Sequence, residues 1–162
     1  MCRLGLPRNN RGYGGRRFRQ LTTGGDDIGY TSQLDAVRRH IAHSRQYLGN
    51  AIIALQDGEA GKAGELLWGS MAQAFHAVAE LRRRNVRTHR DLKNFVLGMS
   101  QSMGDSSLRR DFEEVEKLHD NFYDITHATE DVADIIPAVQ RLTNRAFSLL
   151  PPAAMEDSQV EG

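Results

Sequence analysis

The sequence has one cysteine, four prolines and few aromatic residues, and its positive and negative charges cancel. Because Cys2 is the only thiol, the chain cannot form an internal disulfide, and no zinc motif built on paired cysteines is present. No apolar stretch approaches the roughly 20 residues of a membrane-spanning helix. We therefore expect a cytoplasmic protein that uses no metal or cofactor and has no membrane partner.

The charges, although balanced overall, are unevenly distributed. Residues 1–27 contain six arginines and two aspartates, whereas residues 151–162 contain three carboxylates and no cation. We predict a disordered Arg/Gly-rich tail over 1–28, one helical domain over 29–150 and a disordered acidic tail over 151–162. The first tail is either a solvated segment or an RNA-binding one that uses charge and aromatic stacking.

Apolar residues recur at threes and fours, and no strand pattern interrupts them. This spacing predicts five helices, over residues 32–56, 59–83, 89–102, 106–126 and 129–149. Short connections between such helices favour an all-α, antiparallel, up-and-down bundle of four to five helices. Pro137 predicts either a kink in the last helix or a short helix followed by a longer one.

Several local signals predict where these helices begin and end. Ser32 and Thr88 are each followed three residues later by an aspartate, the spacing of a capping box. Gly58 is a natural stop for the first helix, and Asp105 or Ser106 a natural cap for the fourth. Within the fourth helix, Glu113 and Lys117 have the spacing of a favourable ion pair.

A basic segment joins the second and third predicted helices. Cations at residues 82–84 complement the dipole at a helix end, but those that follow need another explanation. A one-sided basic patch can hold phosphates, so we predict a nucleotide or nucleic-acid surface. Its candidate residues are Arg84, Arg87, His89, Arg90 and Lys93, together with Tyr123.

The segment 118–124 is the densest in groups that can perform chemistry. His119, Tyr123 and His127 are spaced four apart and share one face of a continuous helix. We take His119 and His127, with Asn121, as candidate catalytic residues, since histidine beside a carboxylate is a common general acid or base. The alternative is structural, because histidine and tyrosine at a buried seam often only satisfy neighbouring polar groups.

Three aromatic residues are candidates for the core or for a dimer interface: Trp68, Phe75 and Phe122. Trp68 and Phe75 widen the apolar stripe of the helix over 59–83, which is also rich in small residues. We expect that helix to be central and to be contacted on more than one side.

The chain resembles the PaREP-type family, which is placed within the HEPN superfamily. The resemblance covers residues 32–150 and is carried by "ALQDGE", "KAGELLWGSMAQAFHAVA", "RTHRDL" and "FEEVEKLHDNFYD". It implies a helical bundle, usually a homodimer, that works in a cleft between late helices. Ribonucleases of the superfamily have an arginine and a histidine separated by four to six residues, but Asp120, which six residues separate from His127, stands where that arginine belongs.

A carboxylate would repel the phosphate that such an arginine holds. We therefore expect a dimeric module that binds a partner protein, a nucleotide or RNA without catalysis of its own. Its partner would be a nucleotidyltransferase-like protein or an antitoxin. One alternative is a metal-independent ribonuclease of toxin type, with His127 or His119 as general base and with Arg109, Arg110 or the arginines of the basic segment supplying the cation from a partner chain. The other is a purely structural dimerisation module.

Overall fold

The computed structural model describes residues 24–120 and 128–156, and this part of the chain contains helices and no strand. The all-α helical bundle predicted from the sequence is confirmed. No helix in these two ranges has the length and apolar character needed to cross a membrane. The five longer helices are α1 (Gly24–Gln56), α2 (Ala60–Leu81), α3 (His89–Met103), α4 (Ser106–Asp120) and α6 (Ile136–Phe147); the two short ones are α5 (Thr129–Ala133) and α7 (Pro152–Met155).

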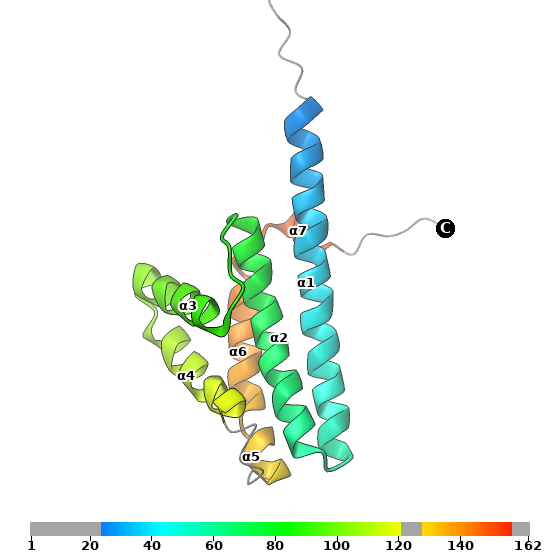
Figure 1. Cartoon of the computed structure of the whole chain (residues 1–162), viewed down its shortest axis with the longest axis vertical. Helices are drawn as coiled ribbons and strands as arrows, with labels where there is room; N and C mark the ends of the chain where they lie inside the picture. Colours follow the sequence, from blue (N-terminus) through cyan, green and yellow to red (C-terminus); the bar gives the residue numbers. More distant parts are fainter. Residues whose placement is uncertain (1–23, 121–127, 157–162) are drawn as a thin grey trace, which may run out of the picture.

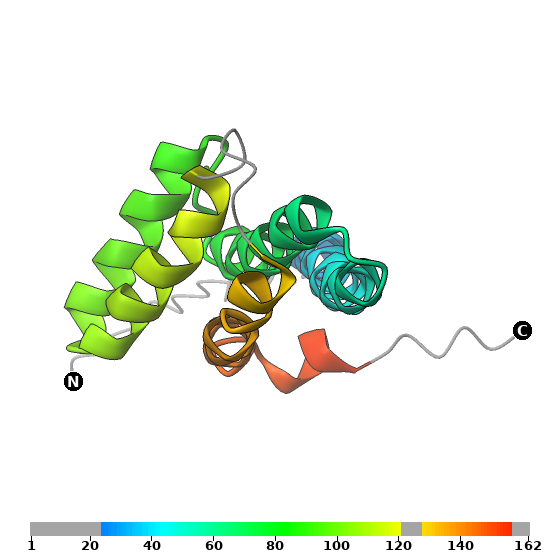
Figure 2. The same ribbon diagram turned by 90° about the horizontal axis from the view of Figure 1, so that it is seen from below.

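Helix α2 lies at the centre of the bundle. It contacts α1, α3, α4, α5 and α6, and Figure 1 shows α1 along one side of it and the α3–α4 pair on the other. Seen from below in Figure 2, α3 and α4 form their own layer beside α2, while α6 lies between that layer and α7. Helix α2 therefore carries side chains toward several neighbours, as its run of small residues predicted.

The core is built mainly on α2, whose apolar stripe is completely buried. Its largest members are Leu67, Met71 and Phe75. They pack with buried apolar side chains from the other helices, such as Phe112 of α4 and Leu142 of α6. Of the two roles predicted for Phe75, the structure shows the core one.

Helices α1 and α2 approach each other closely at two serines. Ser44 Oγ donates to the carbonyl of Ser70, and Ser70 Oγ donates to the carbonyl of Ser44, each over 2.8 Å. A Cβ atom on Gly69 would lie 3.0 Å from the ring of Tyr47, so this crossing needs a residue without a side chain. Each serine hydroxyl thus has a hydrogen-bond partner on the other helix and needs no water molecule at this contact.

The first helix begins eight residues before its predicted start at Ser32. Residues 24–28, assigned to the tail, belong to α1, and Ser32 lies inside the helix and does not cap it. Thr31 Oγ1 donates to the carbonyl of Asp27 one turn earlier, as hydroxyls inside helices do. Extending an existing helix adds one hydrogen bond per residue, which costs far less than starting a new helix at Ser32.

The C-terminal end of the domain also differs from the prediction. Order was expected to stop at Pro151, but Pro152 occupies the first turn of α7, where its missing N–H is no loss. Ala154 is buried against the core, and Arg38 Nη2 of α1 donates to the carbonyl of Ala153 over 2.7 Å. These contacts stabilise α7, which the acidic composition of the segment did not predict.

Other local predictions have mixed outcomes. Pro137 lies in the first turn of α6, directly after the short α5, which confirms the second of its two alternatives. Gly58 has a φ of 76°, as expected for the stop after α1. Glu113 pairs with Arg109, one turn before it, at 2.8 Å.

Candidate functional site

Side chains from three helices meet around the only tryptophan of the chain. Trp68 of α2 stacks on His119 of α4, with ring centroids 4.9 Å apart and planes 21° apart. The ring of His89, at the start of α3, meets Trp68 edge-on at 4.9 Å and His119 edge-on at 4.8 Å. We call these three rings, with Glu116 and Lys93 beside them, the Trp68 cluster.

The position of His89 follows from the way α3 begins. Thr88 Oγ1 accepts a hydrogen bond from the N–H of Asp91, while the Asp91 carboxylate accepts from the N–H of Thr88 over 3.0 Å. The predicted capping box is thus confirmed, and it fixes the first helical residue, His89, against Trp68. The backbone N–H groups of Thr88 and then Arg87 hold the pKa of Asp91 below its ordinary value, so this carboxylate stays ionised.

A buried carboxylate links the ring cluster to a cation. Glu116 is only 8% exposed, and its Oε2 accepts a hydrogen bond from Lys93 Nζ over 2.8 Å. Its Oε1 lies 3.0 Å from His89 Nε2, but the angle leaves that nitrogen without a hydrogen bond. The contact between Glu116 and His89 is therefore one of charge, and it is attractive when the imidazole is protonated.

Each of the two imidazoles has one nitrogen that makes no hydrogen bond. His119 Nδ1 and His89 Nε2 are buried atoms without a hydrogen-bond partner. Buried polar atoms are usually paired, and unpaired ones tend to mark sites that take up a proton, a water or a ligand group. The cluster thus combines a partly buried aromatic ring, one ammonium group and two buried imidazole nitrogens that have no hydrogen-bond partner.

The connection from α2 to α3 adds more cations. Arg84, Arg87 and Arg90 are exposed, as is Arg83, whose φ of 52° lies in the left-handed region that favours glycine. The N–H of Arg84 bonds to the carbonyl of Ala79 over 2.8 Å, which closes the turn at the end of α2. An arginine at such a position costs backbone energy that a glycine would not.

The structure brings together some of the predicted site residues and separates others. His89, expected to contact nucleic acid, meets His119, expected to be catalytic, and Trp68, expected to be an anchor, while Lys93 pairs with Glu116 of the same cluster. Arg84 and Arg87 lie on the connection that leads to this cluster, and Arg90 lies in the first turn of α3. Four of the predicted residues lie outside the described ranges: Asn121, Phe122, Tyr123 and His127.

Glu116 is the member of the site that sequence reasoning missed. It was read only as part of a charged helix, although it lies three residues before His119 on the same face of α4. A carboxylate and a histidine at that spacing next to an apolar stripe are a signal for a shared site. Burial by α2 and α3, which the spacing does not reveal, separates Glu116 from the exposed glutamates around it.

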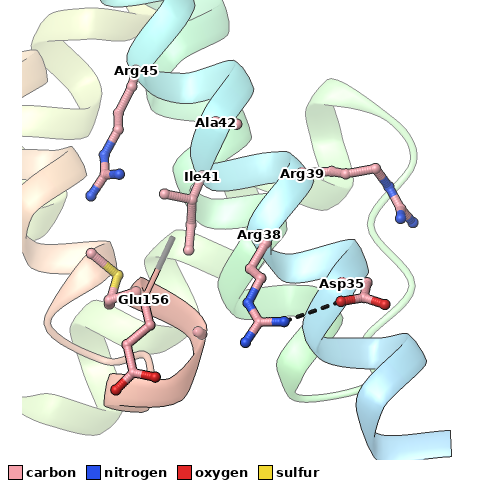
Figure 3. A pocket seen from close by; sticks show the side chains of 9 residues that line it. Asp35, Arg38, Arg39, Ile41, Ala42, Arg45 and Glu156 are labelled. Carbon is pink, nitrogen blue, oxygen red and sulfur yellow. Dashed lines mark hydrogen bonds and ion pairs between the residues drawn. The ribbon is translucent and has the colours of Figure 1, made fainter. Parts of the chain in front are cut away.

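A cavity of about 410 Å³ lies between α1 and α7. Figure 3 shows Arg38 and Arg45 on the side of α1 that faces α7, while Arg39 points the other way. Arg38 is held by Asp35 at 3.1 Å and by the carbonyl of Ala153 at 2.7 Å. Its contacts therefore fasten α7 to α1.

In the described ranges, no three His, Cys, Asp or Glu side chains are grouped so that they could hold a metal ion.

A comparison with protein families found a match to the archaeal PaREP1/PaREP8 family over residues 39–143, which is more than half of the chain. Searches of the curated proteins and of the solved structures found no match. The matched range includes every residue of the Trp68 cluster.

Proposed function

The chain belongs to the archaeal PaREP1/PaREP8 family, and we propose that it is a helical module that binds RNA or a nucleotide without catalysis of its own. The observation that carries this proposal is the Trp68 cluster. An aromatic surface beside a lysine is a combination that single-stranded nucleic acid uses, because bases stack and phosphates pair with cations. The arginines of the α2–α3 connection extend the positive charge beyond the cluster.

Binding without catalysis is favoured by the arrangement around Glu116. The carboxylate that holds Lys93 at 2.8 Å prevents this ammonium from acting as an unopposed cation on a reacting phosphate. An arginine ahead of His127, which the resemblance to HEPN ribonucleases requires, is replaced by Asp120.

The proposal is tested by fluorescence anisotropy with a labelled single-stranded oligo(U) RNA over a range of salt concentrations. Exchanging Lys93 for Gln should weaken binding and reduce the slope of log K against log salt by about one. Exchanging Trp68 for Leu should cost about 1–3 kcal/mol of binding free energy through lost stacking.

Lys62→Gln is the matched control for the lysine exchange. Lys62 is an exposed residue of α2 that pairs with Glu59 at 2.6 Å, away from the cluster. It should leave both the affinity and the salt slope unchanged. Absence of binding by the wild-type protein at low salt would remove the proposal.

We also propose that the chain is a cytoplasmic homodimer with a nucleotidyltransferase-like or antitoxin partner, as membership of the HEPN superfamily would imply. A surface for a second chain is offered by Ile52 and Ile53 of α1, which are 41% and 55% exposed. Light scattering on the purified protein should give twice the monomer mass, and Ile53→Glu should lower it. A monomeric mass for the wild type contradicts the dimer.

A metal-independent ribonuclease of toxin type is the second candidate. The observation in its favour is the pair of imidazoles from different helices, His89 and His119, each with an unpartnered buried nitrogen. Two such groups can divide the roles of general base and general acid in the attack of a 2′-hydroxyl on its own phosphate. The centroids of the two rings lie 4.8 Å apart, so the two imidazoles are neighbours in one cluster.

Cleavage of the same RNA, followed by gel electrophoresis, separates the two candidates. If the chain is a nuclease, His119→Ala and His89→Ala should each lower the cleavage rate by about 100-fold or more. His43→Ala, an exposed histidine of α1, should not change the rate. Cleavage that survives the loss of both cluster histidines would have to come from another site or from a contaminant.

A further inference from the structure

We propose that Glu116 is the positioning residue of the Trp68 cluster and that it couples the binding of a phosphodiester anion to the uptake of one proton by the histidine pair. The inference rests on the proposed function and states how the same site is regulated. It starts from an unusual feature of the fold, a carboxylate that is 8% exposed and shared between a lysine and a histidine.

The carboxylate opposes an anionic ligand as long as His89 is neutral. Glu116 then has a hydrogen bond to Lys93 but no charge-assisted contact with His89. A phosphate that approaches Lys93 meets a negative charge within a few ångströms, and buried charges are little screened by salt. A proton on His89 places a second cation 3.0 Å from Glu116. The electrostatic potential at the cluster then becomes more favourable to an anion.

A second positive charge on the histidine pair is opposed by the first. The rings of His89 and His119 are 4.8 Å apart, so two positive charges there would repel each other. The charged and titratable groups that face His89 in the described ranges are Lys93 on its own helix, and Glu116 and His119 on α4. Helix α2 contributes the uncharged Trp68, which meets His89 edge-on and stacks on His119.

Glu116 also fixes the geometry on which this coupling depends. Its carboxylate, on α4, accepts a hydrogen bond from Lys93 of α3, and α4 also carries His119 one turn later. The Lys93–Glu116 bond holds α3 against α4 one turn beyond His89. Loss of the carboxylate should therefore change both how tightly an anion binds and how its affinity depends on pH.

The test measures the affinity of the full chain for labelled oligo(U) between about pH 5.5 and 8, the range in which imidazoles change charge. Oligo(U) is a suitable probe because its phosphodiesters keep a constant charge over this range. Uptake of one proton should strengthen wild-type binding as pH falls, by at most about tenfold per pH unit. Glu116→Gln, which preserves the shape of the side chain, should flatten this dependence.

Glu113→Gln is the matched control, because Glu113 lies on the same helix, is exposed and pairs only with Arg109 at 2.8 Å among the described contacts. It should retain the wild-type pH profile. His89→Gln is a second variant that removes the proposed proton acceptor without touching Glu116, and it should flatten the profile as well. Emission of Trp68, the only tryptophan, should change with pH in the wild type and less so in both cluster variants, since a protonated imidazole quenches indole.

The outcomes separate this inference from the proposed function. Wild-type binding that is equally tight at both ends of the pH range overturns the proton coupling but leaves RNA binding intact. A Glu116→Gln protein that binds more weakly with an unchanged pH profile shows that Glu116 is merely structural. Absence of binding at every pH overturns both proposals together.

Discussion

Arg83 occupies a backbone conformation in which most proteins place glycine. Its φ of 52° closes the turn after α2, with the N–H of Arg83 bonded to the carbonyl of Glu80 over 3.0 Å. The side chain is exposed, so no packing compensates for the conformation. The left-handed conformation of Arg83 therefore stores backbone energy that no burial of its side chain offsets.

Arg83→Gly should raise the free energy of unfolding by about 1 kcal/mol, because glycine adopts the left-handed region without steric cost. Urea denaturation followed by circular dichroism measures the change. Arg82→Gly, one residue earlier at a φ of −86° that any residue adopts, should destabilise the protein instead. A lower stability for Arg83→Gly would show that the arginine side chain makes contacts that outweigh the backbone strain.

Helix α3 depends on its first turn for both stability and position. Thr88 and Asp91 satisfy each other's N–H groups there, and His89 follows directly. Thr88→Ala should lower the free energy of unfolding by about 1 kcal/mol, as measured by thermal or urea denaturation. Ser106→Ala, at the exposed start of α4, should have less effect, because Asp105 already accepts the N–H of Ser107 over 3.1 Å.

Helices α4 and α6 are joined by an ion pair with an unusually buried acid. Asp111 is 6% exposed, and its two oxygens accept from Nε and Nη2 of Arg141 over 2.9 and 2.8 Å. Asp111→Asn should cost about 1–3 kcal/mol of unfolding free energy, because the amide cannot accept both bonds. Glu113→Gln removes an exposed pair on the same helix and should change stability by less than about 1 kcal/mol.

Element boundaries were predictable wherever a local hydrogen bond decides them. The start of α3 at Thr88 and the stop at Gly58 follow from residue chemistry within a few positions. The boundaries at Ser32 and Pro152 could not be predicted, because helix α1 is extended cooperatively and α7 is fixed by Arg38 across the fold. In both cases a contact or a helix formed elsewhere in the chain overrides a valid local signal.

The stability of the whole molecule should depend on pH through the contact between α1 and α2. The rings of His40 and His76 stack with centroids 5.7 Å apart, and His40 Nδ1 lies 2.7 Å from Gln73 Oε1. Burial, and then the nearby His40, hold the pKa of His76 below its ordinary value. The unfolded chain therefore binds more protons than the folded chain just below about pH 6.5.

The free energy of unfolding should fall as pH is lowered from about 6.5 through the folded pKa of His76, and it should be independent of this residue at higher pH. Urea denaturation at a series of pH values measures the effect. His76→Gln should reduce the slope, whereas His43→Gln, at an exposed position of α1, should retain it. The same slope in the His76 variant would assign the dependence to another group.

The sequence by itself determined the class of the fold, because helical periodicity and capping chemistry act over a few residues at a time. It also identified His119, His89, Lys93 and Trp68 as residues of interest, but for three different roles. Only the tertiary structure placed them in one cluster and made Glu116 part of it, because burial and contact between α2, α3 and α4 depend on how the helices pack. The glutamates of α4 look alike in the sequence, but packing removes water from Glu116 and so gives it a different environment from the others.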